Sequence, residues 1–555
     1  MDQPLIPSLE EKKKKKVNRK KKNKPLCSSD GRVIPSIAVR RAEGERGRYL
    51  VATQPIGAGS VIFCEPALAW TPFPHTSTSL CSFCGTSGDF SSSSCQECQS
   101  VAYCSPSCRQ KDAALHSKAC PFLLQVDGVA GRCDVDPTLL RATILLISSS
   151  QLTSEENQER EAGRVKGEYD LDRATWDEFL LLGFHSPTPE QPNLGLEPAW
   201  KEVVGKALAE LYSLSGTKIV AKYVQIAQRF LENTHAMEDV EGENQLEGLG
   251  MFPRVSLINH SCAPSCCLSR LGDSISVRTL RDHSPGEELT ITYSDLYLST
   301  SERQRQLLES RFFLCQCPRC VSNEKDSLLQ GVLCTRCSPQ VKLPFLEVPL
   351  RSLPSNWLES LPTALLYPKD GQSVTHCSAC GRPQTEKEKA DLSEWIIQTR
   401  EQVKRASYMW SSRQYSDAGG KALKILKESV NKIHPFHEVL FNLYPLLMNF
   451  SRFLKNEEGS IIWCRVIIAA MEQSGAFPAV YPEVSNYYYY LGELYTAAGA
   501  NQATPTGPDS QTLTQNATSY AKQAQEAFRK AESIRIICQG PTHPSTLAAR
   551  ENHSQ

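Results

Sequence analysis

The chain has 555 residues, of which 40% are hydrophobic and 22% charged, a composition typical of globular proteins. This length is too great for one hydrophobic core and allows three or four domains. The sequence contains no run of 18 apolar residues and no apolar signal-peptide core near its start. We therefore expect a protein of the cell interior that makes no contact with membranes.

The charges are unevenly distributed. The 61 basic and 61 acidic residues balance overall, but ten of the basic residues lie between Lys12 and Lys24. Without these ten, 51 basic residues face 61 acidic ones, so the rest of the chain is acidic and suits basic ligands. We expect residues 1–32 to form a disordered, lysine-rich tail, because a block of like charge cannot bury apolar surface. This tail is either a nuclear-localisation or nucleic-acid-binding segment, or a solubilising extension.

The 22 cysteines indicate zinc rather than disulfides, because we expect a reducing compartment. Forty residues from position 81 contain the pattern C-x2-C, C-x2-C, C-x3-C and H-x3-C. Eight such ligands suffice for two tetrahedral zinc sites, and so short and polar a segment needs the metal in order to fold. The eight ligands are Cys81, Cys84, Cys95, Cys98, Cys104, Cys108, His116 and Cys120.

Two further groups of cysteines have ligand spacing. The segment CQCPRC supplies Cys315, Cys317 and Cys320 and lacks a fourth ligand, for which Cys262 is the natural candidate and Cys266 a rival. Two later C-x2-C pairs suit a small zinc ribbon, although four unrelated thiols are the alternative. These two pairs are Cys334 with Cys337 and Cys377 with Cys380.

The stretch LINHSC, residues 257–262, places Asn259 and His260 beside Cys262 after an apolar run. Three interpretations compete: a metal-binding turn, part of a Cys/His nucleophilic site, or a crossing at which Asn and His hold a ligand while Cys ties the loop elsewhere. The remaining cysteines give no support to a catalytic nucleophile. The third interpretation agrees best with a zinc ligand at Cys262.

Strand-like patterns flank the finger and the helix-leaning insertion that follows it. The segments VIF (61–63), ISVRTL (275–280) and LTITY (289–293) alternate or are rich in β-branched residues, and SPGEE forms a turn between the last two. Two β-rich blocks therefore lie on either side of residues 81–225.

The segments RGRYLVAT, the eight-ligand finger, NHSC, PGEELTITY and FFLCQCPRC occur in this order, and roughly residues 40–322 resemble the SET and MYND domain family of protein lysine methyltransferases. With the later patterns, the resemblance implies an α+β multidomain protein. Its parts are a β-rich knotted SET fold split by a MYND zinc finger and a helical insertion, a post-SET zinc site, a small zinc ribbon and a C-terminal α-helical, TPR-like domain. The expected boundaries are 1–32 tail, 33–80 N-terminal SET part, 81–120 finger, 121–225 insertion, 226–300 SET core, 301–322 post-SET segment, 323–388 ribbon and 389–555 helical domain.

The resemblance implies S-adenosylmethionine as the cofactor and the lysine side chains of histone or other proteins as the substrate. It assigns catalysis to Tyr293 and adenine stacking to Phe313, with Tyr169 as a weaker candidate for cofactor contact. It also implies interleaved zinc sites in the finger, with Cys81, Cys84, Cys104 and Cys108 on one ion and the other four ligands on the second. The implied cofactor-binding residues are Arg46, Gly47, Arg48, Asn233, Asn259, His260, Tyr293 and Phe313.

The chemistry of methyl transfer agrees with this assignment, because alignment and desolvation of the reactants suffice and no catalytic metal is needed. The amine must be uncharged, and burial in an apolar channel lowers its pKa. Ordinary structural roles are the alternative: Asn259 as a turn cap, His260 as a buried histidine and Tyr293 as a core aromatic residue.

The chain departs from the usual family pattern at three positions. Ala263, Pro264 and Ser265 follow NHSC where the family usually has Asp-Pro-Asn, and we expect the changes at Ala263 and Ser265 to remove polar groups that brace the turn. Tyr49 stands where a second loop glycine is usual, and glycine permits close approach of the backbone to a ligand.

The last third of the chain is predicted to be helical, because its apolar residues recur with a period near 3.6. A flexible loop of 20 residues is expected from Asn501, and serial helix pairs suggest a TPR-like array. This array is either a wall or peptide groove beside the substrate, or a stabilising cap. The predicted helices span 393–410, 417–433, 438–454, 460–473, 485–500 and 519–538.

These features predict a protein-lysine methyltransferase with structural zinc, monomeric and present in nucleus and cytoplasm. The alternative is a scaffold that recruits Pro-rich partners through the finger and helices, with a weak or inactive SET domain. Direct nucleic-acid binding through the lysine-rich tail is a third possibility.

Overall fold

The computed structural model describes residues 24–27, 33–42, 47–162, 169–185, 196–238, 246–322, 326–338, 341, 343–346, 353, 356–368, 375–502 and 510–554. The predicted cofactor residue Arg46 and most of the lysine-rich tail lie outside these ranges. No helix in the described part of the chain is long and apolar enough to cross a membrane.

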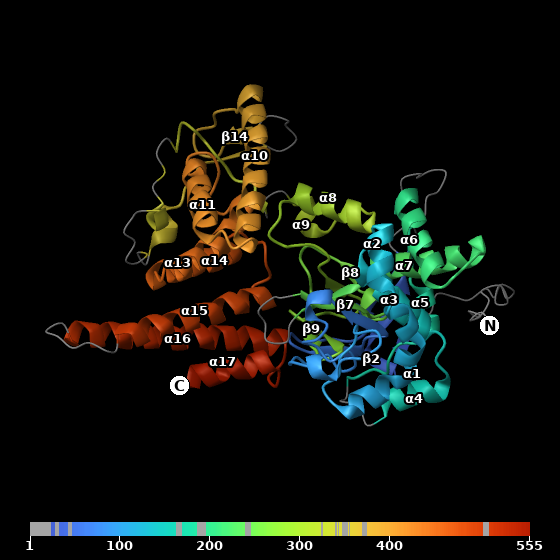
Figure 1. The fold of residues 1–555 in the computed structure, drawn as a ribbon. Helices are drawn as coiled ribbons and strands as arrows, with labels where there is room; N and C mark the ends of the chain where they lie inside the picture. Colours follow the sequence, from blue (N-terminus) through green and yellow to red (C-terminus); the bar gives the residue numbers. More distant parts are fainter. Residues whose placement is uncertain are drawn as a thin grey trace.

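Strands open the described chain, and they belong to three different sheets (Figure 1). β1 lies within the segment predicted to be a disordered tail, and it pairs with β2 in an antiparallel sheet of order β1-β2-β3. The opening strands are β1 (Lys24–Cys27), β2 (Val33–Arg41), β3 (Arg48–Ala52), β4 (Val61–Pro66) and β5 (Ala69–Pro72).

Helices follow in the finger and the insertion. Ser105 caps α1 by accepting a hydrogen bond from the Cys108 N–H, and Pro106 occupies the first turn, where its missing N–H costs nothing. The expected boundaries at 120 and 225 both fall inside helices, so finger, insertion and SET core share secondary structure. The helices are α1 (Pro106–Leu123), α2 (Val126–Cys133), α3 (Pro137–Ser149), α4 (Ser154–Glu161), α5 (Trp176–Leu181), α6 (Pro198–Leu211) and α7 (Thr217–Asn233).

The middle of the chain returns to strands. β10 is the centre of an antiparallel sheet of order β4-β10-β9, and β5, β7 and β6 form another. β8 and β11 pair in parallel, with Asn259 opposite Thr290 and His260 opposite Ile291. These strands are β6 (His235–Glu238), β7 (Leu246–Met251), β8 (Asn259–His260), β9 (Cys266–Leu271), β10 (Ser274–Thr279) and β11 (Thr290–Ile291).

Two helices and a small sheet connect this region to the C-terminal helices. The sheet has the order β12-β13-β14 and carries the last two C-x2-C pairs. The elements are α8 (Thr300–Arg311), α9 (Pro318–Val321), β12 (Val332–Leu333), β13 (Leu365–Pro368) and β14 (Thr375–Cys377).

All six predicted C-terminal segments are helical, but the structure differs from the sequence prediction at three places. The third segment is two helices that meet at Asn442, a further helix begins at Pro544, and the flexible loop predicted from Asn501 is wrong from Ser510 onward, where α16 begins. The helices are α10 (Glu386–Ser411), α11 (Tyr415–Ser429), α12 (Glu438–Phe441), α13 (Leu443–Phe453), α14 (Glu457–Gln473), α15 (Pro482–Gln502), α16 (Ser510–Cys538) and α17 (Pro544–Ser554).

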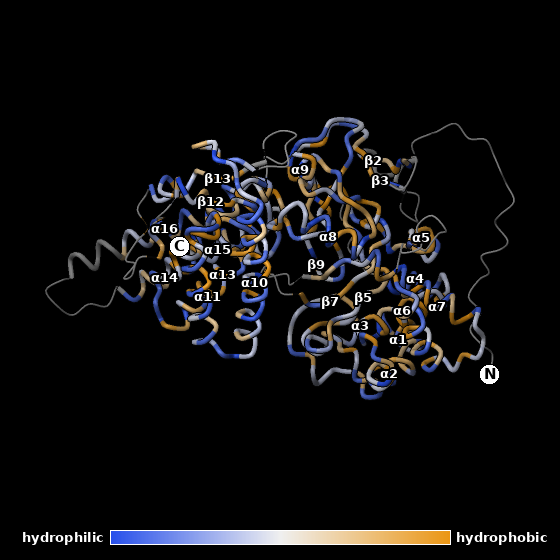
Figure 2. The backbone as a smooth tube through the Cα atoms, turned by 90° about the horizontal axis from the view of Figure 1, so that it is seen from above, coloured by the Kyte–Doolittle hydropathy of each residue, from blue (hydrophilic) through white to orange (hydrophobic). Residues whose placement is uncertain are grey.

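The C-terminal helices form a lobe beside the strand-rich one (Figure 1), and α10 of this lobe is largely hydrophilic (Figure 2). The apolar core of this lobe extends into the strand-rich lobe through Leu296 and Tyr297. The Tyr297 ring stacks on Phe441 with 3.7 Å between ring centroids, and its hydroxyl donates to the Phe436 carbonyl over 3.0 Å. The two lobes therefore share one continuous core at this junction.

A second junction joins the end of α16 to the β4-β10-β9 sheet. The Cys267 thiol lies 3.3 Å from the Cys538 carbonyl oxygen, and Arg278 donates to the Ile537 carbonyl over 3.1 Å. His543 Nε2 lies 3.2 Å from the Arg270 carbonyl oxygen. The last helices thus pack against β9 and β10 of this sheet.

Candidate functional site

Four groups of cysteine and histidine side chains have the geometry of closed metal sites. Within each group the ligand atoms lie within 4.8 Å of one another. Four sulfurs placed tetrahedrally about 2.3 Å from Zn²⁺ are separated by about 3.8 Å. The groups are Cys81, Cys84, Cys104 and Cys108; Cys95, Cys98, His116 and Cys120; Cys262, Cys315, Cys317 and Cys320; and Cys334, Cys337, Cys377 and Cys380.

The measured sulfur separations match this tetrahedron. Sγ–Sγ distances are 3.6 Å for Cys84 and Cys104 and 3.8 Å for Cys95 and Cys120. In the last group, the crossed pairs Cys334–Cys380 and Cys337–Cys377 are both at 3.8 Å. The thiolate-rich donor sets therefore fit Zn²⁺, and their four protein ligands leave no open position for catalysis.

The structure groups Cys262, and not Cys266, with the three cysteines after α8. Cys262 Sγ lies 3.5 Å from Cys320 Sγ and 3.9 Å from Cys315 Sγ. Cys266 points instead into the apolar core of the strand-rich lobe. The turn that carries Asn259 and His260 is thereby linked to the segment after α8.

The parallel pairing of β8 with β11 determines which side chains meet at this turn. Because His260 lies opposite Ile291, Tyr293 is placed two residues further along, beside the histidine ring. The Tyr293 N–H donates to His260 Nδ1 over 2.9 Å, and the two ring centroids are 5.4 Å apart. The Phe313 ring also lies beside this histidine, with its centroid 5.9 Å from that of His260.

His260 and Tyr293 are both uncharged near neutral pH. Burial lowers the pKa of His260 to about 4 and raises the pKa of Tyr293 to about 12. The Tyr293 hydroxyl donates its proton to the Ile258 carbonyl oxygen over 2.5 Å. Its oxygen lone pairs remain free to accept a hydrogen bond from a bound ligand.

Both predicted asparagines are held by neighbouring groups. Asn259 Nδ2 donates to Glu288 Oε1 over 3.0 Å, which fixes the orientation of its carboxamide. Asn233 ends α7, and its Nδ2 donates to the Gly183 and Arg229 carbonyls over 2.9 and 2.8 Å. The sequence prediction missed Glu288, although its place in PGEEL, just before β11, was a signal.

The comparisons with known proteins agree with this arrangement. A SET domain family model matches residues 47–294. Residues 47–294 thus resemble a SET domain. The match contains Asn259, His260 and Tyr293 and surrounds the finger and the insertion, as the sequence order predicts.

Several proteins to which the chain is similar are named as lysine methyltransferases. It is 25% identical to Histone-lysine N-methyltransferase SMYD3 of Homo sapiens, over 52% of this chain and 62% of the relative. It is 26% identical to N-lysine methyltransferase SMYD2 of Homo sapiens, over 51% and 59%, and 28% identical to Histone-lysine N-methyltransferase ASHR1 of Arabidopsis thaliana, over 52% and 57%. The match thus spans less than two thirds of each of these relatives. The resemblance to SET and MYND-type lysine methyltransferases is confirmed at modest identity.

Among solved structures, the SET domain of LSMT bound to lysine and AdoHcy matches with a TM-score of 0.26 and 11% identity, over 94% of this chain and 86% of that one.

The first loop of the SET domain offers room for a ligand. Gly47 has a φ of +66°, and a Cβ placed on it would find no atom within 4 Å. Open space beside a backbone in the left-handed region suits close approach of a cofactor. The Arg48 guanidinium donates to the Leu181 carbonyl. The Tyr169 carbonyl accepts from the Cys64 N–H over 2.8 Å.

The turn after NHSC keeps polar bracing at Ser265, so the expected loss is wrong at that position. The Thr290 N–H donates to Ser265 Oγ over 3.0 Å, and the Ser265 N–H donates to the Thr290 carbonyl over 3.0 Å. Ser265 therefore ties the turn of the SET domain to β11. Tyr49 lies within strand β3, opposite Arg40 of β2.

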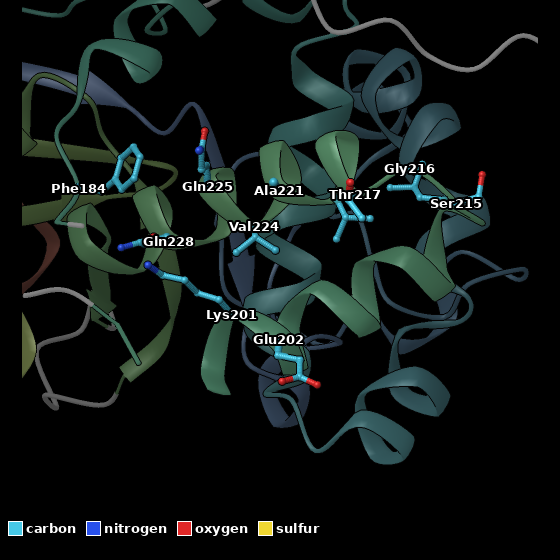
Figure 3. Close-up of a pocket in the computed structure, with 12 residues that line it drawn as sticks. Phe184, Lys201, Glu202, Ser215, Gly216, Thr217, Ala221, Val224, Gln225 and Gln228 are labelled. Atoms are coloured by element: carbon cyan, nitrogen blue, oxygen red, sulfur yellow. The ribbon is translucent and has the colours of Figure 1, made fainter. Parts of the chain in front are cut away.

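A cavity of about 480 Å³ lies between α6 and α7 of the insertion (Figure 3). Phe184, Val220 and Val224 provide apolar walls, and Lys201 extends toward Gln228 at one end. None of the predicted SET-domain site residues lines this cavity.

Proposed function

We propose that the chain is an S-adenosylmethionine-dependent protein-lysine N-methyltransferase whose site is formed by Asn259, His260, Tyr293 and Phe313. The observation that carries the proposal is the parallel pairing of β8 with β11, which groups His260 with Tyr293 beside Phe313. The SET-domain match and the printed activities of the similar proteins support the same reaction.

When bound, S-adenosylmethionine supplies an electrophilic methyl group on a sulfonium sulfur. Gly47 lets the backbone approach the cofactor, and the Asn259 carboxamide, oriented by Glu288, offers a fixed polar contact. His260 is neutral and directs Nδ1 at the Tyr293 N–H, so it braces the site without adding charge. Phe313 presents a ring on which a flat base can stack.

Tyr293 orients the target amine. Because its hydroxyl proton is donated to the Ile258 carbonyl, its oxygen accepts an N–H of the amine and directs the nitrogen lone pair away from the phenol. At pH 7, deprotonation of an ordinary lysine costs roughly 4.6 kcal/mol. Exclusion of water from the site lowers this cost, because burial disfavours the charged amine.

The finer architecture forms part of the same proposal. Residues 81–120 form a MYND finger with interleaved zinc sites, the SET fold is knotted where β8 crosses, and the helices from 389 onward are TPR-like and flank the substrate. Basic, lysine-containing segments of proteins are the substrates, since the body of the chain is acidic, and the protein acts as a monomer in nucleus and cytoplasm. Pro-rich peptides are the expected ligands of the finger.

Transfer of labelled methyl groups from S-adenosylmethionine to core histones and cell-extract proteins tests the proposal. We expect Tyr293→Phe and Asn259→Ala to reduce labelling by about a hundredfold or more, because alignment of the reactants is lost. Tyr408→Phe is the matched control, since Tyr408 is 73% exposed on α10.

Equal labelling by wild type and both site variants would contradict these roles. If the wild type labels nothing and binds no S-adenosylhomocysteine by calorimetry, the methyltransferase proposal fails and the scaffold alternative replaces it.

A further inference from the structure

Arg311, the last residue of α8, lies against the Tyr293 ring. Its guanidinium carbon is 5.6 Å from the ring centroid, within the range of a cation–π contact. Its Nη1 also donates to the Glu232 carbonyl and, over 3.4 Å, to the Leu231 carbonyl. One side chain thus touches the predicted catalytic tyrosine and the end of α7.

These two carbonyls belong to the last turn of α7, where no helical N–H is left to satisfy them. A cation at this end also complements the helix dipole. Arg311 therefore fixes the end of α7, which carries Asn233, against Tyr293. Phe312 has a φ of +60° and reverses the chain after α8, so that Phe313 follows directly into the site.

In the described part of the chain, Arg311 forms no direct ion pair with a carboxylate, although the nearby charge of Glu232 acts to raise the pKa of its guanidinium. The nearest candidate, Glu232, accepts from His185 Nδ1 and from Gln228 Nε2, both over 2.8 Å. Arg311 contacts only the backbone oxygen of Glu232.

The other ionisable groups around the site do not replace this charge. His260 is neutral, and burial together with the charge of Arg311 lowers the pKa of His235 on β6 to about 3. Arg229 on α7 donates to the Leu182 carbonyl over 3.0 Å and stacks over Phe184. Glu288 is the acidic group facing Tyr293, and it accepts from Asn259.

We propose that Arg311 is a positioning residue of the methyl-transfer site, which holds Tyr293 against the end of α7 and favours binding of the target amine in its uncharged form. This inference rests on the proposed function. A fixed positive charge beside an amine lowers the pKa of that amine, and the uncharged amine is the nucleophile. The same charge repels a protonated lysine, so Arg311 selects the reactive form.

The test compares wild type with Arg311→Lys, Arg311→Met and the control Arg305→Met. Arg305 lies on the same helix, is exposed and pairs with Glu302 and Glu309, so its removal changes the net charge equally. Two quantities are measured: the pH dependence of methyl transfer to core histones, and the affinity for S-adenosylhomocysteine by calorimetry. Zinc content and the thermal melt show that each variant is folded.

In Arg311→Met, we expect the pH at which the rate of methyl transfer rises to increase by about one unit. The reason is that the pKa of the bound amine is then lowered less from its ordinary value. We also expect affinity for S-adenosylhomocysteine to fall several-fold, because Asn233 and Phe313 lose their common support. Arg311→Lys retains the wild-type pH dependence, and Arg305→Met resembles wild type in both measurements.

An unshifted pH dependence in Arg311→Met, with or without a uniform loss of rate, would overturn the proposal. If Arg311→Met does not fold, a shifted pH dependence in Arg311→Lys would overturn it equally, because that variant retains the charge. Failure of the methyltransferase proposal is distinct, since the wild type would then neither label histones nor bind S-adenosylhomocysteine.

Discussion

The turn around Cys262 and the C-terminal helices are stabilised in different ways. The buried cluster beside the turn consists of Leu307 and three predicted metal ligands, Cys262, Cys315 and Cys320. The C-terminal helices instead enclose a large apolar core that runs from α10 to α16. We therefore expect order at the turn to depend on the metal in addition to the hydrogen bonds of Ser265, whereas order in the helices depends on hydrophobic burial.

Cys315→Ser should have the largest effect, because it should disrupt the turn around Cys262 and leave the C-terminal helices intact. It removes one thiolate of the site that links the His260 turn to Phe313, and structural zinc supplies about 10–16 kcal/mol of folding free energy in small domains. We expect one zinc ion fewer per chain by mass spectrometry and loss of at least about a hundredfold in methyl transfer. The helical circular dichroism should remain near the wild-type value.

Cys133→Ser is the control, because Cys133 lies on α2 outside the four ligand groups. Collapse of the helical signal together with the zinc site in Cys315→Ser would show that the two regions are not independent.

Ile467→Ala tests the C-terminal helices, which are stabilised by hydrophobic burial. Ile467 is fully buried on α14, and removal of a buried isoleucine side chain costs about 2–5 kcal/mol. Urea unfolding followed by circular dichroism should show this loss while the zinc content stays unchanged. Leu454→Ala, at a position 56% exposed, should change stability by less than about 0.5 kcal/mol. Release of zinc by Ile467→Ala alone would contradict separate stabilisation.

Glu65 fixes the segment that leads into β8, and its effect on stability should depend on pH. Its buried carboxylate accepts from the N–H groups of Arg254 and Val255, and burial raises its pKa to about 7. Because the folded-state pKa exceeds the ordinary value of 4.5, its contribution is greatest at low pH and declines as the pH rises toward 7. Between pH 6 and 7, wild type should lose about 1 kcal/mol relative to Glu65→Gln in urea unfolding.

The exposed change Glu309→Gln serves as the control for this measurement, since the Glu309 side chain is 60% exposed. Parallel stability curves for wild type and Glu65→Gln between pH 6 and 7 would place the pKa of Glu65 near its ordinary value.

Tyr297→Phe is expected to have the smallest effect. It keeps the stacking on Phe441 and removes only the hydrogen bond to the Phe436 carbonyl, which contributes about 0.5–1.5 kcal/mol. If the shared core couples the lobes, unfolding should remain a single transition with a lower midpoint. Two separate transitions would mean that this hydroxyl holds the lobes together.

The parts of the site that depend on short sequence spacing could be predicted. C-x2-C pairs place two thiolates on one tight turn, so the ligands of each pair are evident without knowledge of the fold. The apolar period of 3.6 likewise located the C-terminal helices, although it gave no signal for the polar start of α16. The pairing of β8 with β11 could not be derived from a pattern, because each strand has only two residues.

Buried polar partners were also beyond prediction from the sequence. Ser265 follows a proline in an ordinary turn sequence, and its bond to Thr290 exists only because β11 returns beside the turn. Arg311 has the sequence context of a common basic residue at a helix end. Its contact with Tyr293 depends on how α7 and α8 meet, which no local propensity determines.

The junction between Cys267 and Cys538 has a consequence during synthesis of the protein. The two residues are 271 positions apart, and ribosomes add about 5–20 residues per second, so roughly 15–50 s pass between them. Throughout this interval, the surface of β9 and β10 that α16 later covers is exposed. A nascent chain therefore presents this surface to chaperones, or to neighbouring nascent chains, until its own last helices emerge.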